Sequence, residues 1–164
     1  MLLLVFVQDL LSRSVYWIVF PVLTILFIVA RVVLHQSLSE IGQSVLINCG
    51  FLAAQLLLVS AWFSVKQGKW VNIMSQLLGW GDVLFLLCIT FYLSVLNFLV
   101  FYIVSLMGVL ALWLVGQMLI SKKNRHIPLA GFQAILFAVF LINSWWLMPI
   151  DLMNDDWLLH FIIK

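Results

Sequence analysis

The amino-acid sequence predicts an all-α, polytopic membrane protein with about six transmembrane helices. Of its 164 residues, 66% are hydrophobic and only 9% are charged, and the mean hydropathy is +1.23. A soluble domain of this length is roughly half apolar, so one globular core cannot hide this excess. The apolar residues also gather in runs close to the length that crosses a bilayer. We therefore expect a single transmembrane domain over residues 1–164.

The thickness of a bilayer sets the expected length of each helix. A spanning helix needs about 20 apolar residues, and helices are expected at 1–12, 15–34, 44–64, 82–95, 97–121 and 129–148. The first is short for a full crossing. It is kept as part of the protein because it lacks the basic start and the small-residue cleavage site of a signal peptide. The apolar run from 82 to 121 is too long for one helix, so a break is expected near Ser94–Asn97.

The loops predict the orientation. Six spans place the first, third and fifth loops on one face, and these loops hold most of the basic residues: Arg13, Lys66, Lys69, Lys122, Lys123 and Arg125. The positive-inside rule makes that face cytoplasmic and puts both termini outside. The opposite face has the polar loop "SLSEIGQS" and an acidic tail with Asp151, Asp155 and Asp156. The expected location is the plasma (inner) membrane, crossed several times.

Composition also limits the partners. The net charge of +2 is too small to suggest nucleic acid, and the expected surroundings are the lipid bilayer. Cys49 and Cys88 lie inside apolar segments and form no CxxC pair. We interpret both as packing residues, so no metal, disulfide or cofactor is expected.

Two carboxylates are the candidate catalytic groups. Asp9 and Asp82 lie at the edges of expected spans, and the topology puts both at the cytoplasmic side. Like charges at close range cannot both ionise easily, so one member of such a pair keeps its proton. The ionised member can then activate a water while the other donates to a substrate carbonyl. The alternative for Asp82 alone is a first-turn acid that stabilises the start of its helix.

Two glycines precede the second acid. Gly79 and Gly81 bracket Trp80 in "GWGD". Residues without a β-carbon allow a tight turn and let an extended substrate backbone approach the acid. The alternative is an ordinary glycine-rich loop before a helix.

Three stretches together resemble the type IV prepilin peptidase family, which includes the preflagellin peptidases. "GWGD" at 79–82 resembles the GxGD motif of these intramembrane aspartyl proteases, and "QDLLSRSVYW" at 8–17 resembles the motif of the first acid. "KKNRHIPLAGF" at 122–132 resembles the late basic loop, Ile-Pro and small-residue helix start. The resemblance implies that Asp9 and Asp82 are catalytic and that Arg13 is a basic partner. Arg13 is equally explained by the positive-inside rule.

The chain departs from the family at several places. Tyr16-Trp17 replaces a Pro-Asn pair, and Leu84 replaces a lysine of many bacterial members. The insertion with paired CxxC motifs, which accompanies N-methylation in the large bacterial enzymes, is missing. The resemblance therefore implies an aspartic-type endopeptidase without methyltransferase activity. Its substrate would be a prepilin-like membrane protein with a basic leader, cleaved at the cytoplasmic face.

Two other functions remain open at this point. A catalytically inactive scaffold or assembly partner of a pilus or secretion system would have the same fold. A small ion or proton carrier would use the same two acids. Substituting the acids distinguishes these functions, because a scaffold tolerates the change and a carrier shows acid-dependent flux without cleavage.

Overall fold

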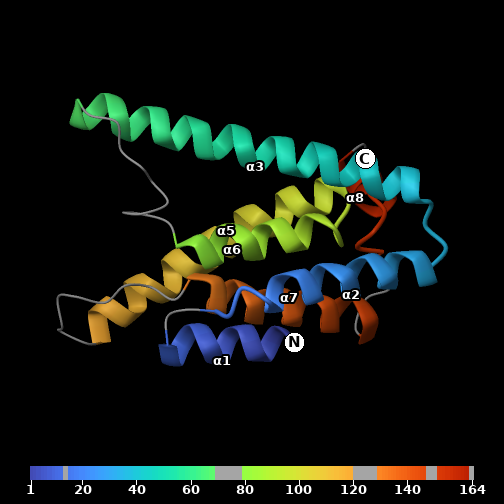
Figure 1. Cartoon of the computed structure of the whole chain (residues 1–164), viewed down its shortest axis with the longest axis horizontal. Helices are drawn as coiled ribbons and strands as arrows, with labels where there is room; N and C mark the ends of the chain where they lie inside the picture. The colour runs from blue at the N-terminus through green and yellow to red at the C-terminus, as the bar shows by residue number, and fades with distance from the viewer. Residues whose placement is uncertain (13–14, 69–78, 120–128, 147–150, 163–164) are drawn as a thin grey trace.

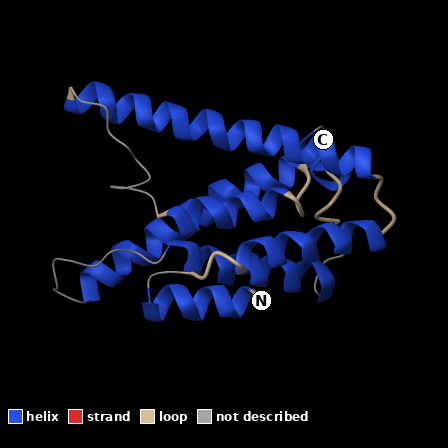
Figure 2. Ribbon diagram, in the orientation of Figure 1, coloured by secondary structure: helices blue, strands red, loops and turns tan. Residues whose placement is uncertain are grey.

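The computed structural model describes residues 1–12, 15–68, 79–119, 129–146 and 151–162. Over these ranges the chain forms helices joined by turns, with no strand (Figures 1 and 2). The all-α prediction is confirmed. The helices are α1 (Leu2–Ser12), α2 (Val19–Val33), α3 (Leu38–Gln67), α5 (Trp80–Thr90), α6 (Val95–Leu119), α7 (Leu129–Trp146) and α8 (Asp156–Ile162).

The stretch expected as an outer loop is mostly helix, which corrects the predicted start of the third helix at residue 44. Ser37 is the N-cap of α3, and its side chain accepts from the backbone N–H of Glu40. The Glu40 carboxylate in turn accepts from the backbone N–H of Ser37. This reciprocal capping box satisfies two helix-end donors at once, so α3 begins at Leu38.

The break inside the long apolar run is real, and it lies slightly earlier than expected. Helix α5 ends at Thr90 and α6 begins at Val95, whereas the expected helices ended at 95 and restarted at 97. The turn between them is fixed from outside, since the backbone N–H of Ser94 donates to the carbonyl of Leu152 at 3.2 Å. A contact so distant in sequence leaves no signal in local composition.

Only α3 satisfies both length and composition for a membrane crossing among the described residues. Its candidate span is Leu38–Lys66, and little of that span is buried. Shorter apolar stretches are α2 at Val19–Val33, α5 at Trp80–Thr90, and the parts Val95–Ala111 of α6 and Ala130–Trp146 of α7. Helices α1 and α5 have 11 residues each, or about 16 Å at 1.5 Å per residue. The six-span topology stays a prediction.

The core is apolar and aromatic, and it centres on α5. The side chains of Phe85, Ile89 and Leu93 are fully buried. Phe137 of α7 packs edge-on against Phe27 of α2, with ring centroids 5.6 Å apart. Helix α5 contacts α2, α3 and α7, and α1 lies along α7. In Figure 1 the end of α1 and the starts of α5 and α7 all lie at the left of the bundle.

Candidate active site at the start of helix α7

Asp9 is held by the first turn of α7. Its side chain is only 9% exposed on α1. The backbone N–H of Gly131 donates to Asp9 Oδ2 at 2.6 Å. The first N–H groups of a helix have no partner within the helix, and the N-terminus favours negative charge. A carboxylate from a different helix thus meets one of these free donors.

Asp82 reaches the same helix start from α5. It lies in the first turn of α5, where the backbone N–H of Gly79 donates to its Oδ2 at 3.1 Å. The backbone N–H of Ala130 lies near enough to act on the Asp82 carboxylate as well. The helix-start role considered from the sequence is therefore present, because Asp82 stabilises the beginning of α5. The contact with α7 is additional to that role.

The two acids converge on consecutive residues of one helix. The backbone of Ala130 acts on Asp82, and the backbone N–H of Gly131 donates to Asp9. The negative charge of Asp9 also acts on the Asp82 carboxylate. Helix α7 brings the two acids together, because it contacts both α1 and α5.

The glycines of the region differ in the room around them. A β-carbon on Gly131 would lie 3.1 Å from Asp9 Oδ2 and 3.3 Å from Asp9 Cβ. A β-carbon on Gly79 would lie 3.1 Å from Asp82 Oδ2, whereas one on Gly81 would meet nothing within 4 Å. Gly79 and Gly131 thus allow close approach of a carboxylate, and Gly81 borders open space.

Sequence reasoning identified both acids but missed their shared anchor. Ala130 and Gly131 act through backbone N–H groups, so neither has a side chain that suggests chemistry. The only signal was the small-residue start of the last helix in "IPLAGF". That stretch entered the argument as part of a family resemblance, without a role for its backbone.

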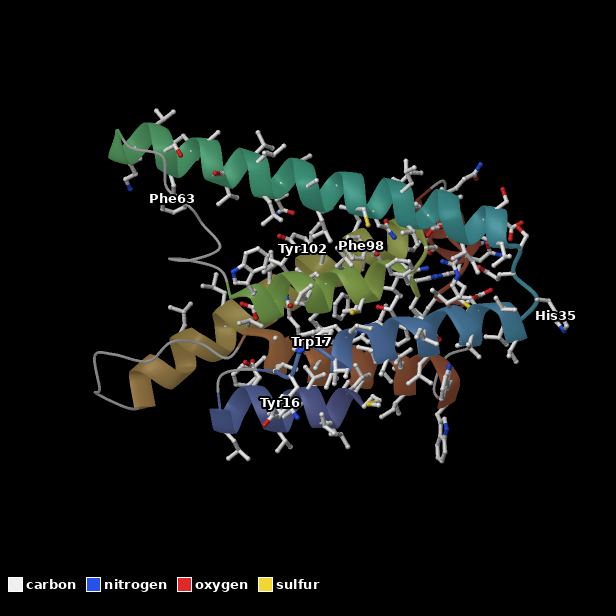
Figure 3. The ribbon with its side chains drawn as sticks, viewed as in Figure 1. Tyr16, Trp17, His35, Phe63, Phe98 and Tyr102 are labelled. Carbon is white, nitrogen blue, oxygen red and sulfur yellow. The ribbon has the colours of Figure 1, made fainter. Side chains whose placement is uncertain are left out.

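The other predicted residues have varied positions. Arg13 lies outside the described residues. Tyr16 and Trp17, which replace the family's Pro-Asn, are 71% and 72% exposed in the segment that joins α1 to α2 (Figure 3). The backbone N–H of Tyr16 donates to Gln8 Oε1 at 3.3 Å, next to Asp9 in the chain. Leu84 packs against the apolar core, where a lysine would be costly to place.

The arrangement offers two carboxylates from different helices and a pair of fixed backbone donors. Within the described ranges, no group of three His, Cys, Asp or Glu side chains could hold a metal ion. Comparisons with protein-family models, with curated proteins and with solved structures find no match for this chain. Any functional assignment therefore rests on the residues of this chain.

Proposed function

We propose that the protein is an intramembrane aspartyl endopeptidase that cleaves the basic leader of prepilin-like proteins at the cytoplasmic membrane face. The observation that carries this proposal is the convergence of Asp9 and Asp82 on the first turn of α7. Capping a helix start needs one carboxylate, whereas here two acids from separate helices meet at the same helix start. A pair of neighbouring carboxylates is the machinery of aspartic proteases.

The proposed chemistry divides two roles between the acids. The ionised carboxylate takes a proton from water, and the protonated one donates to the scissile carbonyl oxygen. The water oxygen bonds to the carbonyl carbon and forms a tetrahedral diol. Breakage of the C–N bond then releases an acid and an amine, which takes up a proton from the pair. The rate should fall at low pH, where both acids are protonated, and at high pH, where both are ionised.

The amides of α7 give the pair its geometry. The backbone N–H of Gly131 donates to Asp9 Oδ2, that of Gly79 donates to Asp82 Oδ2, and the backbone of Ala130 acts on Asp82 as well. Carboxylate groups fixed in this way lose little orientational freedom when substrate binds. The open space at Gly81 gives an extended substrate backbone a route to Asp82. A basic leader suits a site whose described ionisable groups are acidic.

The proposed setting is the inner membrane, with several crossings. Large apolar side chains cover the outside of several helices, as with Ile25 on α2 at 59% exposed, Leu57 on α3 at 70% and Met107 on α6 at 67%. Soluble monomers rarely expose apolar surface on this scale. Lipid around these helices removes the cost of that exposure.

Cleavage of a defined substrate tests the enzyme proposal. Purified protein in detergent should cut a prepilin-like protein after its basic leader and leave the new N-terminus unmethylated. The Asp82→Asn variant is the matched control, because Asn keeps the size of the side chain and its acceptor oxygen. Mass spectrometry of the products gives the readout. Equal cleavage by both proteins, or by neither, would reject the protease and favour the scaffold.

Labelling from the two sides of the membrane tests the topology. Single cysteines at Lys66 and at Asp156 are placed in a variant in which Cys49 and Cys88 are replaced by alanine. The cysteine at 66 should react only with a reagent on the cytoplasmic side, and that at 156 only with a reagent outside. Reaction of both cysteines with a reagent on the same side would contradict the six-span topology.

A further inference from the structure

A second polar cluster lies at the end of the bundle opposite the acids. We call it the latch, and define it as tail residues 151–155 with Ser94 and Asn97, which bind them. The latch lies beside the α2–α3 turn and the α5–α6 turn, at the right of Figure 1. None of its residues has a role in the proposed chemistry.

Asp155 is the centre of the latch. Its Oδ1 accepts from the Ser94 hydroxyl at 2.6 Å and from the backbone N–H groups of Leu96 at 3.1 Å and Asn97 at 3.3 Å. The two backbone N–H groups are among the free donors at the start of α6. A residue 58 to 61 positions away in sequence thus caps this helix.

Asn97 also binds the tail, through its side-chain amide. Its fully buried side-chain amide donates to the carbonyls of Asp151, Leu152 and Asn154 and to the Ser94 hydroxyl. The α2–α3 turn joins through Gln36, which donates to the Met153 carbonyl and accepts from Nε of Arg31 on α2 at 2.8 Å. The negative charges of Asp151 and Asp155 act on the buried Arg31.

We infer that Asp155 is a positioning residue for the acid pair, acting through α5. One end of α5 is next to the latch at Ser94, and the other end carries Asp82. The helix has 11 residues and is about 16 Å long. A short, packed helix moves as a unit, so a shift at its latched end reaches Asp82 and its contact with Ala130. This inference rests on the proposed function for its catalytic meaning.

The test compares Asp155→Ala with Asp155→Asn and with Asp156→Ala. Alanine removes the acceptor, asparagine keeps an oxygen in the same place, and the neighbouring Asp156 is exposed on the tail and serves as the matched control. Hydrogen–deuterium exchange is followed at the amides of Gly79, Ala130 and Gly131, which bind the two acids, in detergent and without substrate. Cleavage kinetics are measured in parallel.

Asp155→Ala should speed exchange at these three amides by about three- to thirtyfold, the range that loss of a helix cap produces. It should lower kcat by a similar factor with little change in KM. Asp155→Asn should keep exchange and kcat close to wild type, and Asp156→Ala should leave exchange and kcat unchanged. Faster exchange confined to residues 94–97 and the tail would overturn the inference, because the latch would then be a local cap.

Two further results separate this inference from the proposed function. If no substrate is cut but exchange changes at the distant amides, the positioning role stands and the protease fails. If cleavage occurs and exchange stays local, the protease stands and the positioning role fails. Should Asp155→Ala not fold, Ser94→Ala is judged by the same exchange pattern. It removes one of the three donors to Asp155 together with the hydroxyl contacts to Leu152 and Asn97, and it keeps the two backbone donors.

Discussion

The two ends of the bundle use carboxylates at helix starts in opposite ways. At the latch, the Asp155 carboxylate accepts three hydrogen bonds, and its negative charge acts on the buried Arg31. At the start of α7, two carboxylates meet backbone donors, and the negative charge of Asp9 acts on the Asp82 carboxylate. The first arrangement balances charge, whereas the second concentrates it.

The difference indicates what each end is for. A carboxylate that accepts several hydrogen bonds and lies near a cation stabilises a structure in its ionised form. A pair of like charges has a cost that one proton relieves, so it is ready to exchange protons with a substrate. The same helix-start geometry therefore gives a structural cluster at one end and a reactive one at the other.

The largest effect on stability is expected at the latch. Asn97→Ala removes an amide whose two N–H groups are shared among the Ser94 hydroxyl and three tail carbonyls, and it leaves those acceptors with fewer partners. Losing a buried partner costs about 1–3 kcal/mol, so the free energy of unfolding should fall by roughly 2–3 kcal/mol. Unfolding in detergent by chemical denaturant measures this loss. Asn143→Ala, on the half-buried part of α7, is the control.

A loss below about 0.5 kcal/mol for Asn97→Ala would show that the latch adds little to stability. The latch would then not be the stabilising end of the bundle, and the contrast with the acid pair would fail.

A smaller effect, on activity alone, is expected at the glycines. Alanine at 79 would place a methyl group 3.1 Å from Asp82 Oδ2, whereas alanine at 81 meets nothing within 4 Å. Gly79→Ala should therefore slow cleavage about tenfold, since a displaced catalytic group loses rate steeply. Gly81→Ala should stay close to wild type, while a bulky residue at 81 should block the substrate. Initial rates at saturating substrate measure the difference.

Equal rates for the two alanine variants would mean that the Asp82 carboxylate tolerates displacement. The contact with Gly79 would then matter only for the start of α5. Thermal unfolding of both variants serves as the check, because neither substitution should lower stability enough to explain a tenfold loss of rate.

Much of the fold could be predicted because local patterns determine it. Apolar runs between polar segments indicated six helices, and each has a counterpart among those of the structure. The predicted bounds were wrong where distant or reciprocal contacts determine a helix end, and α8 (Asp156–Ile162) was not predicted. Ser37 and Glu40 extend α3 through a capping box, and Leu152 holds the α5–α6 turn from across the chain. The crossing of the membrane by six helices remains a prediction.

The site was predictable only in its side chains. Asp9 and Asp82 stood out because acids are rare and costly beside apolar runs. The amides of Ala130 and Gly131 could not stand out, because every residue except proline has a backbone N–H. The latch was invisible for another reason. Asp155 lies in a polar tail, where a carboxylate needs no explanation, and its partners are about 60 residues away.

A double-mutant cycle on cleavage rate tests the central claim most directly. Asp9→Asn and Asp82→Asn should each reduce the rate by about a thousandfold or more, and the double variant should be little worse than either, because residues that act as one catalytic unit are not additive. All three proteins should still insert and keep their fold. Losses that multiply, or full activity in Asp9→Asn, would contradict a shared site and leave Asp82 as the cap of α5.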